Sequence, residues 1–393
     1  MKKNSAALIL ILSLILGGCG DKLSPWLEGK GVTLDQQWLI SPEDFDAHDL
    51  FLVGESHGVA ENYSLMYDLT LWFHKQGVRY HLAEYGYSHG QMVNRYLETG
   101  DRGILDELFA HLEGTAAWSK ETYQFYERIY QYNQGLPREQ RIIMVGIDIE
   151  HQPRTAVNYL RRLAWEAGPA PSNLAGPGLL ANPPEGDVRL LTTALLEDLE
   201  AKERQYRLWL GREFFSFQMT VRNIQNYIAS NAEDRQDFDR IREEAIYSNF
   251  LAVASHLPPG KFFGQWGMEH VYQRLADTYM GQQPRFAMLA RDDNDSPVWG
   301  KVLSMAIIYG PESRAMSWGR EYGIGGVHQQ FTHIKPFIQA AQGKITLFPL
   351  QGAGSPFAKD LYIVRRPLQG GVTTDYFQYA IVIPRGTPAE PLK

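Results

Sequence analysis

Short apolar segments alternate along the chain with longer segments of helical periodicity. Residues 50–53 and 80–83 are continuous apolar runs that suit buried strands, and residues 61–75 between them place apolar side chains on one face of a helix. The same patterns predict strands at 142–147, 261–264, 285–289, 302–308, 345–348, 361–364 and 379–383, and helices at 92–97, 104–112, 121–132, 153–165 and 270–280. Strands that alternate with helices predict an α/β fold with a mostly parallel central sheet flanked by helices.

One long segment departs from this alternation. After a stretch rich in Gly, Pro, Ala and Asn at 168–184, which we interpret as a loop, residues 188–256 have helical periodicity almost throughout. We therefore expect a single domain over residues 49–393 with a helical subdomain at 188–256. We expect residues 19–48 to form a polar tether, and the glycine-rich stretch 319–326 to form a mobile loop.

The N-terminus resembles a bacterial lipoprotein signal. Lys2 and Lys3 precede an apolar stretch at 6–16, which is too short for a stable transmembrane helix. It ends in Leu16-Gly17-Gly18-Cys19, which resembles a lipobox. We therefore expect a signal peptide at 1–18, a lipidated Cys19, and a protein anchored by lipid in the cell envelope, on the outer-membrane or periplasmic side or outside the cell.

Composition narrows the classes of partner. The net charge is −7 and the sequence contains no basic run, so nucleic acid is not an expected partner. Cys19 is the single cysteine, so a protein sent to an oxidising compartment must be stable without a disulfide. We expect a small-molecule substrate, and membrane contact only through the lipid anchor.

Acidic and imidazole side chains occur where four predicted strands end. The first strand is followed by Glu55 and His57, the second by Glu84, the third by Asp148, and the strand near 262 runs on to His270. Ligands bind at the carboxyl edge of open parallel sheets, because the loops at that edge surround one crevice. Burying such groups is costly unless they are paired or used, so we interpret them as one functional cluster.

Three kinds of chemistry suit this cluster. In the first, His57 acts as a general base oriented by Glu55 or Glu84, and His270 acts as an acid or as a donor to an oxyanion. In the second, Ser56 lies in a G-x-S-x-G sequence between a strand and a helix and forms a triad with Asp148 and His270.

The third kind of chemistry is a metal site. Glu55, His57, Glu84 and His270 combine carboxylate and imidazole ligands, which suit zinc or iron. The sequence contains no closely spaced histidine pair or cysteine set that favours this hypothesis, so we expect no cofactor, and a divalent metal stays an alternative.

Several motifs resemble the erythromycin esterase family in the order in which they occur. They cover residues 50–165 and 235–275 and comprise Leu52-Val53-Gly54-Glu55-Ser56-His57-Gly58 with Glu61, Leu82-Ala83-Glu84, Val93-Asn94-Arg95-Tyr96-Leu97, Tyr130-Gln131-Tyr132-Asn133, Val145-Gly146-Ile147-Asp148, Ile241-Arg242-Glu243-Glu244-Ala245 with Asn249, and Trp266-Gly267-Met268-Glu269-His270-Val271.

The resemblance implies a metal-independent esterase. Its histidine base corresponds to His57, supported by Glu55 and Glu84, and its later histidine corresponds to His270. Its arginine corresponds to Arg242, which would hold the substrate or the oxyanion.

Three further residues are candidates for contacts to a ligand. Glu61 and Asp148 match patterned positions of the family, and we include Tyr85, which follows Glu84, among the expected substrate contacts.

The chain also departs from this family. A single residue separates Glu55 from His57, where the family usually has two, and the segment from about 295 onward matches no motif. With this shorter spacing the chain resembles the wider superfamily that contains haem-binding ChaN-like lipoproteins. The alternative function is therefore a surface lipoprotein that binds haem or another planar ligand without catalysis. The aromatic side chains that suggest such a ligand are Tyr85, Tyr87, Trp266 and Tyr272.

Overall fold

The computed structural model describes residues 22–36, 39–182, 188–232, 235–278 and 281–392. The expected signal peptide and Cys19 lie outside the described residues. Among those that are described, no helix is both long and apolar enough to cross a membrane.

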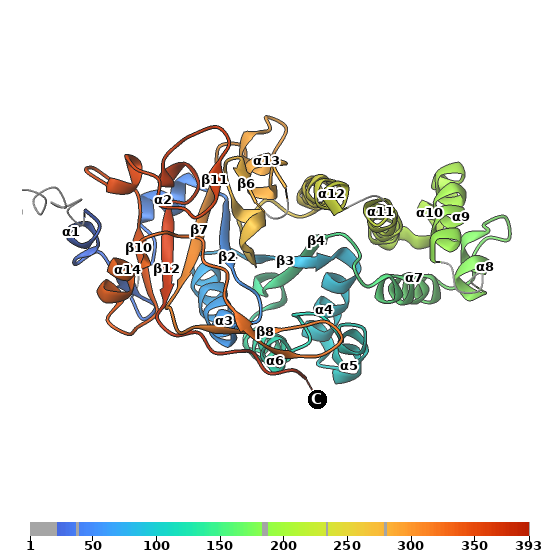
Figure 1. Cartoon of the computed structure of the whole chain (residues 1–393). Helices are drawn as coiled ribbons and strands as arrows, with labels where there is room; N and C mark the ends of the chain where they lie inside the picture. Colours follow the sequence, from blue (N-terminus) through green and yellow to red (C-terminus); the bar gives the residue numbers. More distant parts are fainter. Residues whose placement is uncertain (1–21, 37–38, 183–187, 233–234, 279–280, 393) are drawn as a thin grey trace, which may run out of the picture.

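A mixed sheet of eight strands forms the centre of the molecule, in the order β1-β10-β12-β7-β2-β5-β3-β4 (Figure 1). Its parallel part comprises β2 (Leu50–Glu55), β3 (Tyr80–Gly86), β4 (Ile143–Asp148), β5 (Phe262–Gly267), β7 (Val302–Tyr309) and β12 (Tyr379–Ile383). At one edge β10 (Thr346–Pro349) and β1 (Val32–Thr33) are antiparallel. The predicted fold class, α/β with a mostly parallel sheet, is confirmed.

Both faces of the sheet are covered, which explains why its strands are apolar throughout rather than alternating. On β2, Leu50 and Leu52 face a cluster that includes Phe250 of α12 (Arg235–His256). Phe51 and Val53 face the opposite cluster, which α3 (Ala60–Lys75) completes. Since successive side chains of a strand point to opposite faces, one uninterrupted apolar run supplies two cores.

The other helices follow in chain order. Near the strands are α2 (Pro42–Ala47), α4 (Tyr87–Thr99), α5 (Arg102–Ala110), α6 (Lys120–Gln134), α13 (Phe286–Asp292) and α14 (Ile334–Ala341). Beyond β4 are α7 (Pro153–Ala167), α8 (Gly176–Ala181), α9 (Val188–Ala201), α10 (Glu203–Leu210) and α11 (Phe214–Ser230). Figure 1 shows α8, α9 and α10 at the end of the molecule farthest from α1 (Ser24–Leu27). The segment expected to be a helical subdomain consists of helices α9 to α12, and the stretch expected to be only a loop contains α8.

The described part of the expected tether, residues 22–36 and 39–48, packs against the domain, so the prediction of a polar tether is wrong there. Its β1 pairs with β10, and the ring of Phe45 in α2 stacks on that of Phe51, with centroids 5.4 Å apart. Leu23 and Leu27 are also buried. The segment looks polar because these few apolar residues are widely spaced.

Four expectations along the chain also differ from the structure. Residues 285–289 belong to helix α13 rather than to a strand, and residue Ile363 forms an isolated bridge instead of part of a strand. The described part of the helix expected at 270–280, residues 270–278, is not an α-helix. The chain forms a short 3-10 helix there, η3 (Met268–Val271), and then β6 (Ala276–Asp277), which pairs with β11 (Arg366–Pro367). Part of the glycine-rich stretch forms β9 (Gly323–Gly326), paired with β8 (Arg314–Ser317).

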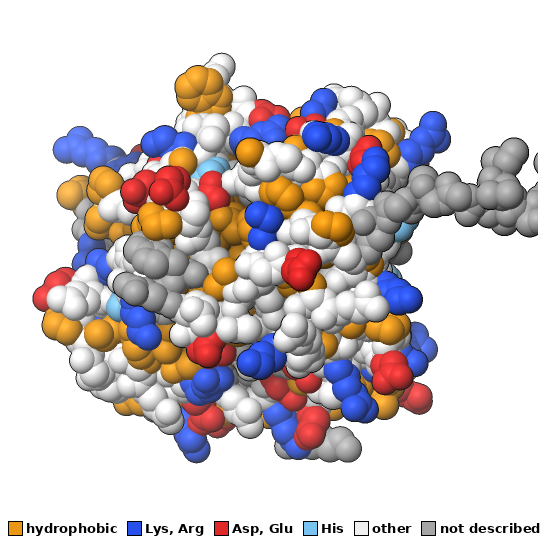
Figure 2. All heavy atoms as spheres, turned by 90° about the vertical axis from the view of Figure 1, so that its left-hand side faces the viewer, with side chains coloured by type: hydrophobic (Ala, Val, Ile, Leu, Met, Phe, Trp, Pro, Cys, Tyr) orange, Lys and Arg blue, Asp and Glu red, His pale blue; other side chains and the backbone are white. Residues whose placement is uncertain are grey.

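The surface at the α1 end carries charges of both signs. On the face shown in Figure 2, Lys and Arg side chains are interspersed with Asp and Glu side chains, and hydrophobic atoms lie between them.

Candidate active site

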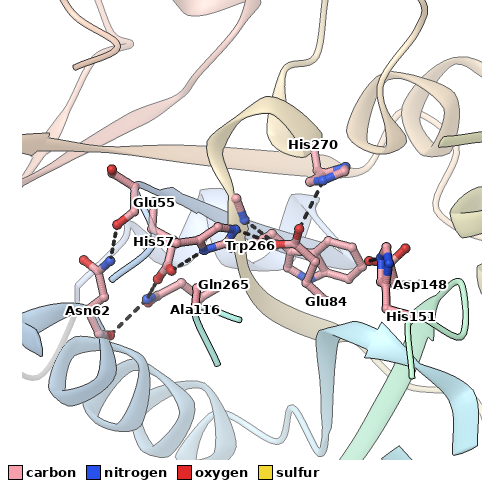
Figure 3. Close-up of polar contacts among 12 residues, drawn as sticks. Glu55, His57, Asn62, Glu84, Ala116, Asp148, His151, Gln265, Trp266 and His270 are labelled. Carbon is pink, nitrogen blue, oxygen red and sulfur yellow. Dashed lines mark hydrogen bonds and ion pairs between the residues drawn. The ribbon is translucent and has the colours of Figure 1, made fainter. Parts of the chain in front are cut away.

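The carboxyl ends of neighbouring parallel strands bring the predicted residues together. Glu55 ends β2, Glu84 lies near the end of β3, and His270 lies in η3, directly after β5. In the sheet β5 lies between β2 and β3, so the three loops are adjacent. Figure 3 shows the side chains of Glu55, His57, Glu84 and His270 directed toward one another.

An irregularity in β3 accompanies Glu84. Between Ala83 and Gly86 the pairing with β4 shifts, so that Ala83 pairs with Gly146 whereas Gly86 pairs with Asp148. Three residue steps on β3 thus oppose two on β4, as in a β-bulge. Bulges re-aim side chains, and this one lies where the strand must present Glu84 to the neighbouring loops.

His57 is held firmly by Glu55. Its Nδ1 lies 2.8 Å from Oε1 of Glu55. The other carboxylate oxygen, Oε2, accepts a hydrogen bond from Nε2 of Gln265 on β5. Because Glu55 is itself fixed in this way, it fixes the orientation of the imidazole ring.

The turn that carries His57 is fixed by side chains that the sequence motifs did not reveal. The backbone N–H of Ser56 donates to the hydroxyl of Tyr309 at 3.0 Å, and that hydroxyl donates to Oδ1 of Asn62 at 2.8 Å. Nδ2 of Asn62 in turn donates to the carbonyl of Ser56 at 2.8 Å. This closed set of hydrogen bonds satisfies a buried turn and leaves it little freedom.

Gly267 makes room for the ring of His57. A Cβ atom at position 267 would lie 2.9 Å from Nε2 of His57 and 3.3 Å from Oε2 of Glu84. Its backbone N–H donates to Oε2 of Glu84 at 2.6 Å. A glycine at this position therefore lets the end of β5 approach both side chains closely.

Four donors surround the carboxylate of Glu84. Oε1 accepts from Nη2 of Arg242 at 2.8 Å and forms an ion pair with Nε2 of His270 at 3.2 Å. Oε2 accepts from the N–H of Gly267 and lies 3.6 Å from Nε2 of His57. Glu84 is therefore the central acceptor of the cluster, shared by two imidazoles and one guanidinium.

Arg242 is not an exposed helix residue. It lies on α12, its side chain is 13% exposed, and its Nε donates to Oδ1 of Asp148 at 3.0 Å. Asp148 also forms an ion pair with His151 at 3.2 Å. Asp148 thus holds the guanidinium that reaches Glu84, and it is fully buried and does not line the cleft in which a substrate contact was expected.

Sequence reasoning missed a fourth carboxylate, Glu243. It is 1% exposed, and its Oε1 lies 2.8 Å from Nδ1 of His270 and 3.5 Å from Nη1 of Arg285. Its other oxygen accepts from the backbone N–H of Phe286 at 2.8 Å. A run of charges on a predicted helix, Arg242-Glu243-Glu244, gives no signal that the middle residue points into the core.

The carboxylates raise the pKa values of both histidines. Burial alone would lower the pKa of His57, but the charge of Glu84 and the hydrogen bond to Glu55 outweigh it and raise that pKa to about 10. Burial and Arg242 lower the pKa of His270, while Glu243 and Glu84 raise it, to about 9 overall. Both rings are therefore imidazolium ions at neutral pH.

The opposite shift applies to Glu84. Burial by itself raises the pKa of this carboxyl, but the positive charges of His270 and His57 hold it well below its usual value. Glu84 is consequently ionised and is a poor proton acceptor.

The cluster lines an open cleft of about 420 Å³. His57 is the most accessible of its charged members, with 36% of the side chain exposed against 14% for Glu84 and 3% for His270. The indole of Trp318, which follows β8, stands edge-on to the His57 ring at 6.1 Å between centroids. The lining residues are Glu55, Ser56, His57, Glu84, Phe238, Asp239, Arg242, Gly267, Met268, Glu269, His270, Trp318, His328 and Gln330.

Two residues that we expected to contact substrate do not line this cleft. Glu61 instead binds the C-terminal segment. Its carboxylate accepts hydrogen bonds from the backbone N–H of Thr387 at 2.7 Å and from the hydroxyl of Thr387 at 2.9 Å. The ring of Tyr85 lies beside that of His89, with centroids 4.4 Å apart.

The structure does not assemble the serine triad. Oγ of Ser56 accepts from the backbone N–H of His328 at 3.0 Å, whereas His270 contacts Glu84 and Glu243, and Asp148 contacts Arg242. Backbone geometry explains the second glycine of the G-x-S-x-G sequence, Gly58. It has φ +82°, and a Cβ there would lie 2.3 Å from the carbonyl oxygen of Met316.

The four proposed metal ligands do not fit a cation. A guanidinium nitrogen of Arg242 already lies 2.8 Å from Glu84, and a divalent cation would have to share that carboxylate with it. Both nitrogens of each imidazole lie near a carboxylate oxygen, at 2.8 and 3.6 Å for His57 and at 3.2 and 2.8 Å for His270. Within the described ranges, no group of three or more His, Cys, Asp or Glu side chains is placed to hold a metal ion.

Comparisons with known proteins identify the fold. No protein-family model matches the sequence, and no curated protein matches it in sequence. Among solved structures, a Bacillus cereus protein superposes with a TM-score of 0.71 at 16% identity, and a protein described as a succinoglycan biosynthesis protein with 0.68 at 15%. Each comparison covers 94% of this chain and 98% of the other.

Erythromycin esterase EreC, as a mutant in its open conformation, superposes with a TM-score of 0.59 at 10% identity, over 92% of this chain and 98% of that protein. This protein therefore has the fold of the erythromycin esterase, as the ordered motifs led us to expect. The coverage also extends the shared fold into the C-terminal third, for which the sequence supplied no motif. At these identities the likeness establishes the fold, and any activity must be argued from the site.

Proposed function

We propose that the protein is an esterase-like hydrolase in which His57 activates a water molecule for attack on an ester carbonyl. The observation that carries this proposal is the asymmetric environment of His57. Its Nδ1 is occupied by Glu55 at 2.8 Å, whereas its Nε2 lies 3.6 Å from Glu84 in a ring that is 36% exposed to the cleft. Nε2 is therefore the nitrogen that meets water.

The proposed chemistry needs only side chains of this chain. Nε2 of neutral His57 removes a proton from water, whose oxygen bonds to the ester carbon while the π electrons of the carbonyl move onto its oxygen. The imidazolium that forms keeps its Nδ1–H hydrogen bond to Glu55. The carbonyl then re-forms as the bond to the leaving oxygen breaks, and the alkoxide takes the proton from Nε2, which leaves a carboxylic acid, an alcohol and neutral His57. A base and acid placed in this way contributes roughly 10²–10⁴-fold to the rate.

Arg242 supplies a donor for the developing oxyanion. Nε and Nη2 are occupied by Asp148 and Glu84, and Arg242 lines the cleft. Within the described chain, Nη1 makes no hydrogen bond to another residue. This N–H is free to donate to the carbonyl oxygen as it gains charge, which is the kind of preorganised interaction that stabilises a transition state.

A panel of chromogenic esters tests the proposal. The purified domain should hydrolyse at least one of them, and His57→Ala should lower kcat/KM by about 100-fold or more. His74→Ala is a matched control, because this histidine lies on α3 and contacts Tyr132 and the carbonyl of Gln140 instead of the cleft. Turnover that survives His57→Ala, or that His74→Ala removes equally, would contradict the assignment.

The alternative of a haem-type ligand finds little support in the aromatic residues that suggested it. Trp266 is 1% exposed and donates to the carbonyl of Leu82, and Tyr272 is fully buried with its hydroxyl donating to Gln330. Tyr87 contacts Ser216. None of these three residues lines the cleft, and neither does Tyr85. We therefore propose a hydrolase rather than a protein that binds a haem-type ligand.

We propose further that the hydrolase acts in the bacterial cell envelope, attached through lipid on Cys19. The support is the lipobox-like Leu16-Gly17-Gly18-Cys19. Labelling cells with a clickable fatty acid should mark the protein but not its Cys19→Ser variant, and equal labelling of both would contradict this proposal.

A further inference from the structure

One imidazole and two carboxylates extend from His57 into the core as a chain. In order, Glu243 contacts His270 at 2.8 Å, His270 contacts Glu84 at 3.2 Å, and Glu84 lies 3.6 Å from His57. Figure 3 shows the part of this chain from His270 through Glu84 toward His57. Its far end, Glu243, is buried and does not line the cleft.

Charge balance ties the members of this chain together. Glu55, Glu84, Asp148 and Glu243 carry four negative charges, and Arg242 and Arg285 supply two positive ones. These six groups alone carry a net charge of −2, which protonation of His57 and His270 offsets, while His151 lies against Asp148 at the other end of the cluster. An uncompensated charge in such a site costs several kcal/mol, so loss of one carboxylate favours release of a proton from the histidine beside it.

His270 is the histidine that Glu243 governs. The charged groups around its ring are Glu243 and Arg242 on α12 and Glu84 on β3, with Arg285 behind Glu243 before α13. Of the two carboxylates, Glu243 makes the shorter contact. Without it, the ring would face Arg242 with one carboxylate fewer.

We propose that Glu243 is a positioning residue for hydrolysis: it keeps His270 charged and turned toward Glu84, so that Glu84 stays ionised beside His57. This inference rests on the proposed function of His57. It assigns to Glu243 no contact with substrate and no proton transfer to it. Its effect reaches the reaction through His270 and Glu84, and therefore through kcat rather than through KM.

The helix offers a matched control for the test. The neighbouring residue Glu244 is 61% exposed on the same helix and pairs with Arg240 at the surface. Glu243→Gln and Glu244→Gln remove the same charge from adjacent positions. Glu243→Asp keeps the negative charge but moves it away from His270 by the length of one methylene group.

Ester turnover by the full-length protein supplies the first readout. Glu243→Gln should lower kcat by about a hundredfold, as misplacement of a supporting group does, with KM changed less than threefold. Glu243→Asp should recover part of the loss, and Glu244→Gln should match the parent protein. Equal activity of the two glutamine variants would overturn the proposal, as would a loss in Glu243→Gln that appears only in KM.

Histidine ¹⁵N resonances supply a second readout that needs no substrate. At pH 7 His270 should be charged in the parent protein and in Glu244→Gln, but neutral in Glu243→Gln. A charged His270 in a folded Glu243→Gln protein would overturn the proposal. If Glu243→Gln does not fold, the spectrum of Glu243→Asp should still show His270 titrating at lower pH than in the parent protein. Unchanged titration of His270 in Glu243→Asp would overturn the proposal. If no ester is hydrolysed while His270 responds as expected, the proposed function fails and the Glu243–His270 coupling stands.

Discussion

Nδ1 of His57 lies 2.8 Å from Oε1 of Glu55, and this pair defines which nitrogen of the ring can do chemistry. In the neutral ring, a carboxylate that accepts from Nδ1–H leaves the lone pair on Nε2. The one-residue spacing between Glu55 and His57 makes this contact local, because Glu55 ends β2 and His57 lies in the turn that follows. The side chain of His57 is 36% exposed and lines the cleft.

Ser56 should be dispensable for turnover. Its Oγ accepts from the backbone of His328, and the histidines of the cluster are held by carboxylates. Ser56→Ala should therefore keep kcat/KM within about threefold of the parent, since it removes a single neutral hydrogen bond. A fluorophosphonate probe, followed by mass spectrometry, should leave Ser56 unlabelled. Labelling at Ser56 together with loss of activity would instead establish a serine nucleophile.

Activity should rise with pH through the alkaline range. The pKa of His57 is raised to about 10, so the neutral form that can accept a proton increases about tenfold with each pH unit below that value. The logarithm of kcat/KM should accordingly rise with unit slope and level off near pH 10. Glu84→Gln removes the largest cause of the raised pKa and should move this plateau to lower pH. It should also lower the height of the plateau, because ionised Glu84 no longer lies beside the ring to orient it.

A pH profile of the parent protein and of Glu84→Gln checks this sign. If kcat/KM were instead constant to pH 10 and fell above it, protonated His57 would be the active form, and it would act as an acid rather than as a base.

Loss of Arg242 should slow the chemical step. Its guanidinium contacts Glu84 and Asp148 and, in the proposed mechanism, the oxyanion. Removing one such donor costs about 10²–10³-fold in kcat. Arg242→Gln should show this loss, whereas Arg240→Gln, which affects a surface arginine of the same helix paired with Asp237 and Glu244, should not. A parallel loss in both variants would indicate a general effect on α12.

The buried parallel strands and the grouping of the candidate residues at one edge could be predicted from the sequence, because both depend on local patterns. Apolar runs mark the buried parallel strands, and Glu55, Glu84 and Asp148 directly follow or end them. Parallel strands carry their ends to one edge, so no knowledge of the loops was needed to group these residues.

The wrong predictions arose where one sequence pattern is compatible with two structures. Residues 285–289 are a short apolar run, which periodicity alone cannot divide between strand and helix, and they begin α13. Only the three-dimensional structure shows that Glu243, Gln265 and Trp318 belong to the candidate site. Each of them fits the sequence pattern of its own helix, strand or hairpin, so the pattern gave no reason to assign it to a site. A charged helix residue, a strand glutamine and an aromatic residue in a hairpin carry no local mark of their tertiary neighbours.

Trp318 should affect binding more than chemistry. Its indole is 46% exposed and forms a wall of the cleft beside His57. A stacked aromatic contributes roughly 0.5–1.5 kcal/mol, so Trp318→Ala should raise KM about two- to tenfold with kcat nearly unchanged. Trp299→Ala is the control, since this tryptophan is also exposed but lies away from the cleft. A fall in kcat with constant KM would show that Trp318 acts on the reaction itself.

Glu150 should make the fold less stable as the pH rises. Burial raises the pKa of this carboxyl to about 7, against hydrogen bonds from Ser88 and Asn223 that lower it. In the unfolded chain it ionises near its ordinary value of 4.5. Between these two pH values the folded state binds the extra proton, so stability falls as the pH rises and is constant above about 7.

The shift corresponds to about 3 kcal/mol at neutral pH. Glu150→Gln keeps the shape without the charge and should raise the free energy of unfolding at pH 8 by up to that amount, with little change at pH 4.5. Denaturant unfolding at both pH values measures the difference, and Glu139→Gln at the surface serves as the control. A variant that gains as much stability at pH 4.5 as at pH 8 would show that the gain does not come from the ionisation of Glu150.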